Sequence, residues 1–246
     1  MKALKKIISY PLSVLHYLTF GLAIVIFHPI QWLALKIGYQ PHKKSVDYLV
    51  FFLLTSIYVL GYKIRFVNKH KLPEGVPLIF VSNHQSLNDV TVLGWFLRKY
   101  HPKYVSKIEL GKGIPSISFN LRHGGSVLID RKDAKQSISA IIKFGEYLER
   151  TKRSAIIFPE GTRSKDGVPK RFSENGLKML VKKTPTGYVV PVTINNSWKT
   201  VRYGHFPLEV FVDLSIEVHE PVKNSDLPFE ELFLKVEKEI KDAVVV

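Results

Sequence analysis

Two long stretches without formal charge lie near the N-terminus, and they constrain the fold of this chain more than any other feature. No Asp, Glu, Lys or Arg occurs between Lys6 and Lys36, and none occurs between Asp47 and Lys63. Apolar residues surround each segment instead of forming one stripe, so neither has the pattern of a surface helix of a soluble domain. The segments therefore favour a lipid environment.

The length of these segments favours docking in a bilayer over crossing it. A spanning helix needs about 20 apolar residues, but Pro11 and Pro29 leave only Leu12 to His28 between them. We expect residues 1–62 to form a helical hairpin set into one leaflet, with its lysines at the lipid headgroups. A two-span anchor and a pair of buried core helices are the alternatives. A secretory signal is not favoured, because no small-x-small cleavage site follows.

The charge of the chain indicates an anionic partner. Lys and Arg number 36 against 21 Asp and Glu, a formal charge of +15. Such an excess suits nucleic acid, an anionic bilayer, or an acidic substrate or carrier protein. No aromatic-and-basic recognition motif is present, so nucleic acid is not expected. The chain has no cysteine, which excludes disulfides, thiolate metal sites and a cysteine nucleophile.

The remainder of the chain, residues 63–246, alternates short β-branched runs with longer amphipathic ones. The strand candidates are "KIRFVN", "VPLIFVSN", "KYVSK", "GSVLID", "SAIIFP", "GYVVPVTI" and "EVFVDLSIEV", and the helix candidates are residues 87–100, 134–151, 174–183 and 228–246. This alternation predicts one α/β domain with a mixed, largely parallel sheet and flanking helices. Sites in such sheets normally lie at the carboxyl ends of the strands.

One of these strand-to-helix junctions, "VSNHQSLND", places Asp89 five residues after His84. On a continuous helix the two side chains would be about 140° apart and unable to touch. If His84 instead ends a strand and Asp89 enters the next helix, the carboxylate folds back and can orient an imidazole base. The alternative is a turn histidine followed by an aspartate that stabilises a helix N-terminus. His42 and Asp47 have the same spacing within a basic connector, which we interpret as chance.

Three later junctions carry polar clusters. They are Asp130–Arg131, the run Glu160–Gly161–Thr162–Arg163, and "VVPV" around Pro191. Glycine lets backbone amides approach an anion, and arginine offers a planar fork for phosphate oxygens. Each cluster alone is also compatible with an ordinary turn or a solvated surface charge.

In this order the four blocks "NHQSLND", "GSVLIDR", "FPEGTRS" and "VVPV" resemble those of the glycerolipid acyltransferase family with the HxxxxD motif. Within it, the chain resembles the bacterial 1-acylglycerol-3-phosphate acyltransferases. The resemblance covers residues 78–192, and its third block is the most specific. The second block departs from the family at Leu128, where an aromatic residue is common.

The resemblance implies a role for each matching residue. His84 would be the general base for a glycerol hydroxyl, and Asp89 would orient it. The residues expected to contact the phosphate-bearing substrate are Lys107, Arg131, Glu160, Gly161, Thr162 and Arg163. No metal and no cofactor are implied.

The implied reaction transfers an acyl chain from acyl-CoA or acyl carrier protein to lysophosphatidate and forms phosphatidate. The chain would act at the cytoplasmic face of the inner membrane, on anionic lipids. Another acceptor, such as glycerol-3-phosphate or a different lysophospholipid, is the first alternative. The second is a basic membrane-binding module without catalysis.

Overall fold

The computed structural model of the protein describes residues 2–245. Within this range eight strands form one sheet in the order β1-β7-β6-β2-β5-β3-β4, with β8 paired to β6. The strands are β1 (Lys63–Asn68), β2 (Leu78–Ser82), β3 (Pro102–Lys107), β4 (Val127–Ile129), β5 (Ser154–Ile157), β6 (Tyr188–Asn195), β7 (Asp213–Val218) and β8 (Val222–Lys223). The α-helices are α1 (Lys2–Ile37), α2 (Tyr39–Tyr58), α3 (Asn88–Phe96), α4 (Ile117–His123), α5 (Ala134–Thr151), α6 (Glu174–Lys183) and α7 (Phe229–Asp242).

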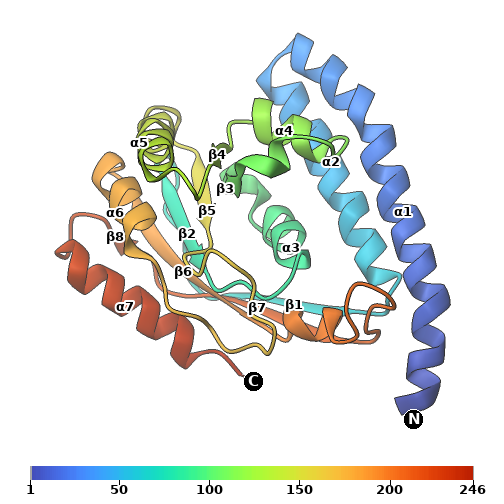
Figure 1. Cartoon of the computed structure of the whole chain (residues 1–246). Coiled ribbons are helices and arrows are strands. Elements are labelled where there is room, and N and C mark those ends of the chain that lie inside the picture. Colours follow the sequence, from blue (N-terminus) through green and yellow to red (C-terminus); the bar gives the residue numbers. More distant parts are fainter. Residues whose placement is uncertain (1, 246) are drawn as a thin grey trace.

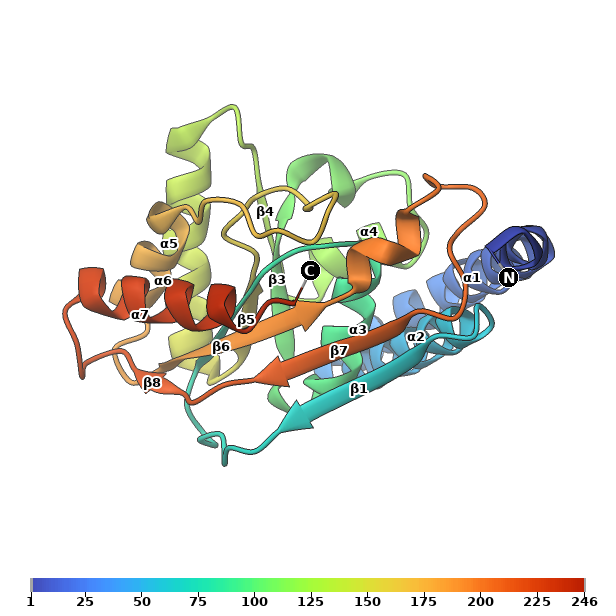
Figure 2. The same cartoon turned by 90° about the horizontal axis from the view of Figure 1, so that it is seen from below.

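The sheet is mixed and largely parallel, as the alternation of strands and helices predicts. Strand β2 is parallel to both β5 and β6, and β3 is parallel to β4 and β5. Only β7 and β8 run antiparallel to β6 among the described residues, and β1 is parallel to β7 (Figure 2). The predicted fold class is therefore confirmed.

Helices cover both faces of this sheet, so its central strands are buried on both sides (Figure 1). Alternate residues of β2 enter two different cores: Leu78 and Phe80 pack with side chains of α2 and α3, whereas Ile79 and Val81 pack with those of α5, α6 and α7. A strand buried on both faces needs a continuous apolar run, which "PLIFV" supplies. The rigid central strands fix the positions of the loops at their carboxyl ends.

Several predicted elements differ from the observed ones at their ends. The predicted helix over residues 87–100 divides into α3 and a short 3-10 helix at Arg98–Tyr100. The last predicted strand begins at Asp213 instead of residue 209, because the preceding segment leaves the sheet. Helix α4 and two further 3-10 helices, Ile108–Gly111 and Ser197–Val201, are too short to show a period in the sequence.

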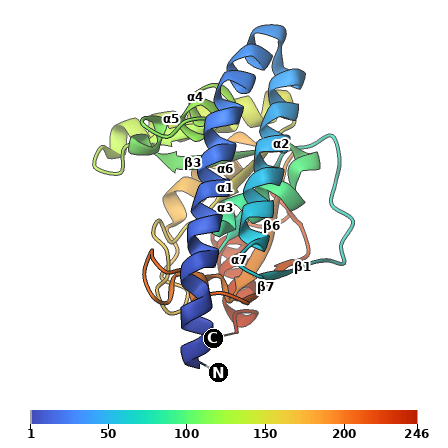
Figure 3. The ribbon, with the colours of Figure 1, turned by 90° about the vertical axis from the view of Figure 1, so that its right-hand side faces the viewer.

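The N-terminal hairpin is present, but its first helix is longer than the prolines suggest. Helix α1 continues through Pro11 and Pro29 as one helix of 36 residues, so the predicted boundaries at these prolines are wrong. A proline removes one backbone hydrogen bond, and packing against α2 offsets that loss. Ala23 of α1 packs against Leu49 and Leu53 of α2, and the two helices lie side by side (Figure 3).

Polar contacts attach α1 to the rest of the molecule along its length. The hydroxyl of Ser13 accepts a hydrogen bond from the backbone N–H of Leu208 at 2.8 Å. His28 Nδ1 accepts one from the N–H of Ser116 at 3.0 Å, and His16 Nδ1 donates to the carbonyl of Ser56 in α2 at 2.8 Å. These three polar side chains of the apolar segment thereby have partners within the protein, whereas the buried amide of Gln31 has none among the described residues.

The outer surface of α1 is apolar and exposed. Residues Ala3–Ile37 are long and apolar enough, by length and composition, to cross a membrane, and only 22% of the apolar window is buried. A core helix would be mostly buried, so the interpretation of the first segment as a core helix is wrong, whereas Leu54 and Ile57 of α2 do enter the core. The exposed large apolar side chains of α1 include Leu4, Ile7, Val14, Leu18, Leu22, Val25, Ile26, Trp32 and Leu33. The division into domains at residues 62 and 63 stays a prediction.

Candidate active site

The loop between β2 and α3 carries the candidate base, and side-chain hydrogen bonds hold it in place. Asn83, at the end of β2, donates from Nδ2 to the carbonyl of Ile194 and accepts from the N–H of the same residue, both at 2.8 Å. Gln85 Oε1 accepts from the N–H of Ser197 at 2.9 Å. The loop is therefore attached to β6 and to the segment that follows it, and His84 lies between these two attachments.

The structure brings His84 and Asp89 into direct contact. His84 Nδ1 lies 2.8 Å from Asp89 Oδ2, because Asp89 is in the first turn of α3 and its side chain folds back toward the strand end. The same carboxylate oxygen accepts from the backbone N–H groups of Gln85 at 2.6 Å and Ser86 at 2.8 Å. The sequence spacing thus produces the compact turn that a base and its orienting carboxylate require.

Asp89 is almost completely buried, with 1% of its surface exposed. Its second oxygen, Oδ1, accepts hydrogen bonds from the hydroxyls of Ser86 and Ser197. A buried carboxylate needs such partners to remain ionised without a large desolvation cost. An ionised Asp89 fixes the Nδ1–H tautomer of His84, which directs the lone pair of Nε2 outward.

The imidazole of His84 is held from one side by an aromatic ring. Phe158, just after β5, stacks on it with a centroid separation of 4.1 Å and an angle of 19° between the planes. Within residues 2–245 Nε2 makes no hydrogen bond, and 16% of the His84 side chain is exposed. The ring therefore has a fixed orientation and one nitrogen available to a substrate proton.

Glu160, predicted to contact substrate, instead has both oxygens occupied by backbone groups. Oε1 accepts from the N–H of His84 at 2.7 Å, and Oε2 accepts from the N–H of Lys170 at 2.9 Å. Burial raises the pKa of this carboxyl above its usual value, and the two backbone hydrogen bonds and the positive charges nearby act in the opposite direction. These contacts give Glu160 a positioning role toward His84.

The rest of this segment forms a basic loop beside the base. The Arg131 guanidinium donates to the carbonyl of Gly161, whose positive φ of 69° suits glycine. Lys170 Nζ donates to Thr162 Oγ1 at 2.8 Å and to the carbonyl of Arg163 at 2.9 Å. Arg131, Thr162 and Arg163 are exposed, so the loop presents cationic groups to an anionic ligand. Their assignment to substrate contact stays a prediction.

Lys107 lies at the same edge of the sheet as His84, but further along that edge. It is the last residue of β3 and pairs with Ile129, the last residue of β4, two positions before Arg131. Its side chain is exposed. No hydrogen bond or ion pair joins it to the other predicted site residues in the described chain.

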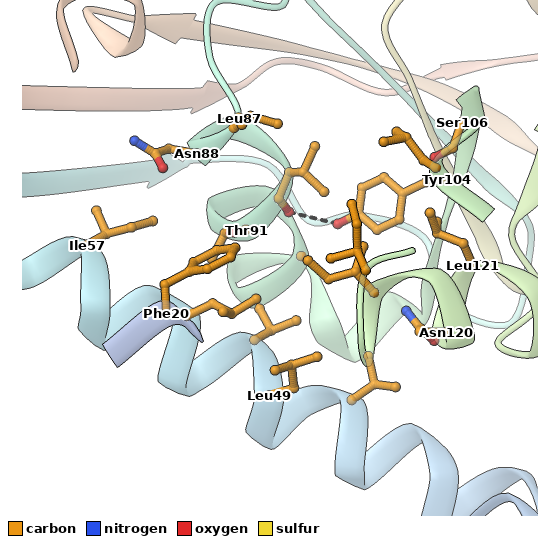
Figure 4. Close-up of a pocket in the computed structure, with 18 of the residues that line it drawn as sticks. Phe20, Leu49, Ile57, Leu87, Asn88, Thr91, Tyr104, Ser106, Asn120 and Leu121 are labelled. Atoms are coloured by element: carbon orange, nitrogen blue, oxygen red, sulfur yellow. Dashed lines mark hydrogen bonds between the residues drawn. The ribbon is translucent and has the colours of Figure 1, made fainter. Parts of the chain in front are cut away.

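A cavity of about 420 Å³ opens beside this site, between the hairpin and the sheet. Ser86, Leu87 and Asn88 line one end of it, directly after His84 in the sequence. Most of the remaining lining is apolar and comes from α1, α2, α3, β3 and α4 (Figure 4). Tyr104 closes one wall by donating to the carbonyl of Val90 at 2.9 Å. The cavity can hold an alkyl chain.

Some functional contacts carry no signal in the sequence. The orienting roles of Asn83, Gln85 and Ser86 are detectable in principle, because these residues lie within the first block. Ser197 and Lys170 are not, because only the folded chain brings them to Asp89 and Thr162. Within residues 2–245 no group of three or more His, Asp or Glu side chains is placed to hold a metal ion.

Comparison with known proteins identifies relatives of this chain. The family model described as Acyltransferase matches residues 63–195. The 1-acyl-sn-glycerol-3-phosphate acyltransferase of Helicobacter pylori is 33% identical over 65% of this chain and 67% of its own length. A chloroplastic enzyme of the same name from Arabidopsis thaliana is 28% identical over 82% of this chain. The chain spans 54% of the length of the Arabidopsis protein and 48% of a chloroplastic relative from Brassica napus.

A solved structure supports the fold. The crystal structure of the 1-acyl-sn-glycerophosphate acyltransferase PlsC from Thermotoga maritima superimposes with a TM-score of 0.78, over 98% of this chain and 95% of the other, at 23% identity. The shared architecture thus includes the N-terminal hairpin as well as the sheet. With the family model covering more than half of its residues, the chain belongs to the acyltransferase family.

Proposed function

We propose that this protein transfers an acyl chain from an acyl thioester to the free hydroxyl of lysophosphatidate and so forms phosphatidate. The observation that carries the proposal is the pair of His84 and Asp89, 2.8 Å apart. The carboxylate is buried and the second ring nitrogen is open. The pair lies between a basic loop suited to a phosphate and a cavity suited to an alkyl chain. The relatives named above carry the same activity in their names.

The reaction needs no nucleophile from the protein. His84 Nε2 removes the proton of the substrate hydroxyl as its oxygen attacks the carbonyl carbon of the thioester. The resulting imidazolium is stabilised by Asp89 through Nδ1. The tetrahedral intermediate then collapses with cleavage of the C–S bond, and His84 returns the proton to the departing thiolate. General base catalysis of this kind contributes about 10²- to 10⁴-fold to a rate.

Both substrates suit the surroundings of the base. Lysophosphatidate is an anionic amphiphile that resides in the leaflet where the exposed apolar face of α1 would dock. Acyl-CoA and acyl carrier protein are both anionic, and the net charge of +15 attracts either. Both donors are water-soluble molecules of the cytoplasm, which favours the cytoplasmic face of the membrane as the place of reaction. An assay with each donor in turn decides between acyl-CoA and acyl carrier protein.

The test is a thioester-release assay on the purified protein with lysophosphatidate, glycerol-3-phosphate and lysophosphatidylcholine offered in turn. Each acceptor is combined with acyl-CoA and, separately, with acyl carrier protein. We expect thiol release coupled to phosphatidate formation with lysophosphatidate. A higher kcat/KM with glycerol-3-phosphate or lysophosphatidylcholine would show that this acceptor, and not lysophosphatidate, is the preferred substrate.

The matched variants are His84→Ala and His70→Ala. His70 lies in the loop between β1 and β2, at the opposite end of β2 from His84. We expect His84→Ala to abolish acyl transfer and His70→Ala to retain it. Full activity in His84→Ala would exclude the proposed base, and the absence of product from every acceptor would favour a non-catalytic membrane-binding module.

A further inference from the structure

The two ends of the cavity differ in chemistry. One end is formed by Ser86, Leu87 and Asn88 next to the base, and the walls are apolar. The far end is polar and cationic, and it is lined by His42 and Lys43 of α2, His101 just before β3, Lys103 of β3, and Asn120 of α4. A cavity meant only for the methyl end of an alkyl chain does not require charged groups at its far end.

Lys103 is the central group of this far end. It is 8% exposed, and burial together with the positive charges of Arg153 and Lys43 lowers its pKa to about 7. The one acid that counteracts this shift is Asp47, and Asp47 is already paired with Lys43. A buried ammonium without a carboxylate of its own is costly. An anion bound beside Lys103 would supply the missing counter-charge.

Arg153, the cation near Lys103, is held by aromatic side chains and not by a carboxylate of the described residues. The Arg153 guanidinium stacks on the ring of Tyr39, 3.5 Å from its centroid, and donates to the hydroxyl of Tyr147. Lys103 Nζ itself lies 5.1 Å from the centroid of the Tyr39 ring. Tyr39 is held by a hydrogen bond between its hydroxyl and His101 Nδ1 at 2.8 Å. These contacts fix the positions of the cationic groups at this end of the cavity.

His42 provides the second, independent observation. It is 1% exposed, and its Nε2 has no hydrogen-bond partner among the described residues. Buried polar atoms are almost always paired, and a ligand group placed beside His42 would give this nitrogen a partner. The amide of Asn120 lines the same end, from the α4 side (Figure 4). Three groups that can donate hydrogen bonds, Lys103, His42 and Asn120, therefore line the same cavity.

We propose that this end binds the carboxylate of a long-chain fatty acid, whose alkyl chain extends through the apolar part of the cavity toward α3. A carboxylate has two oxygens, which suit Lys103 and His42. The lining from His42 to Ile57 spans 15 residues of α2, or about 22 Å at 1.5 Å per residue. The fatty acid lies with its head away from His84, opposite to the direction in which an acyl donor would insert its chain. It therefore excludes that chain from the cavity.

The experiment uses orientation as its readout and needs no turnover, so its outcome is independent of the proposed acyltransferase activity. The full chain in lipid nanodiscs is irradiated with hexadecanoic acid that carries a diazirine at its methyl end, and the cross-linked residues are mapped by mass spectrometry. We expect labels at the α3 end of the cavity, on Ile57, Asn88 or Leu208. Labels beside His42 and Asn120 would show that the chain enters methyl end first, and would overturn the proposal, as would the absence of any label in the cavity.

Two further probes test the head group. A fatty alcohol with the same diazirine is expected to label the cavity at least about tenfold less, the effect of losing one charge-assisted hydrogen bond. Equal labelling by the alcohol would remove any role for the cationic end. A monoalkyl phosphate with the same chain is expected to label less than the acid. Stronger labelling by the phosphate would overturn the assignment to a carboxylate.

The matched variants are Lys103→Met and Lys99→Met. Methionine retains most of the apolar volume of Lys103 and removes its charge, whereas Lys99 is on the surface with 64% of its side chain exposed. We expect loss of labelling in Lys103→Met and wild-type labelling in Lys99→Met. Unchanged labelling in Lys103→Met would contradict the proposal. The orientation mapped on the unmodified protein decides the question if that variant fails to fold.

Discussion

The backbone N–H of His84 donates to Glu160 Oε1 at 2.7 Å. This hydrogen bond joins the loop after β2, which carries the base, to the loop after β5, which carries the basic groups. The other oxygen of Glu160 accepts from the N–H of Lys170, so one carboxylate positions two segments that lie far apart in the sequence. We expect a carboxylate engaged in this way to position the base, and its contact with the substrate stays a prediction.

Replacing Glu160 should therefore lower kcat and leave KM for lysophosphatidate nearly unchanged. Glu160→Ala leaves two backbone N–H groups without acceptors, a loss of about 1–3 kcal/mol in the free energy of unfolding. Glu160→Gln keeps one acceptor oxygen and should have a smaller effect on both quantities. Steady-state kinetics over a range of lysophosphatidate concentrations checks this. A rise in KM with unchanged kcat would instead indicate direct contact between Glu160 and the substrate.

Replacing Asp89 tests the orientation of the base. Asp89→Asn removes the negative charge that stabilises the imidazolium, so we expect kcat to fall by about 10²- to 10⁴-fold. Ser197→Ala removes only one hydrogen bond to Asp89 Oδ1 and should reduce kcat far less. Comparable losses in the two variants would indicate that the Asn variant acts by disturbing the loop and not through charge. Circular dichroism of both variants provides the control for folding.

A larger side chain in the cavity should shorten the acyl chains that the enzyme accepts. Leu121 is 6% exposed and lines the cavity on α4, so Leu121→Phe reduces the space available to the methyl end. We expect kcat/KM to fall for long donors and to remain close to wild type for short ones. Overpacking costs about 1–3 kcal/mol of stability. Leu22→Phe, on the exposed face of α1, is the control and should leave the chain-length profile unchanged.

Association with the membrane should withstand high salt. Salt screens the attraction between lysines and anionic headgroups, but it does not weaken the burial of apolar side chains. Large apolar residues are exposed along α1, so we expect the protein to remain in the membrane fraction after a high-salt wash and to be released by detergent. Release by salt alone would show that charge holds the protein and that the hairpin is not inserted.

Acid should destabilise the protein in part through His42. Burial, together with the positive charges of Lys103 and His123, lowers the pKa of His42 from 6.5 to about 4. The unfolded chain therefore binds a proton at His42 in a pH range where the folded chain does not. This contribution is fully present above pH 6.5 and is lost as the pH falls toward 4, by about 3 kcal/mol at most. Thermal unfolding at a series of pH values should show a shallower acid loss in His42→Gln than in wild type. An equal loss of stability with falling pH in both proteins would contradict the lowered pKa of His42.

Much of the architecture could be predicted from local pattern. The apolar run "PLIFV", the helical period of residues 134–151 and the uncharged segments before residue 63 each determine an element by their own residues, because secondary structure depends on periodicity within one segment. The extent of α1 could not be predicted, because packing against α2 decided whether the helix continued past its prolines. Helix α4 was missed because seven residues are too few to establish a period.

The sequence by itself determined the fold class, the hairpin and the pair of His84 and Asp89, since five residues across one turn suffice to bring these two side chains together. Only the tertiary structure decided what surrounds them. Ser197 reaches Asp89 from 108 positions away, Glu160 reaches His84 from 76 positions away, and the cavity exists because α2, β3 and α4 enclose it. The same spacing of histidine and aspartate at His42 and Asp47 produced no such pair. Asp47 bonds Lys43 instead, because on the continuous helix α2 a separation of five turns the two side chains apart.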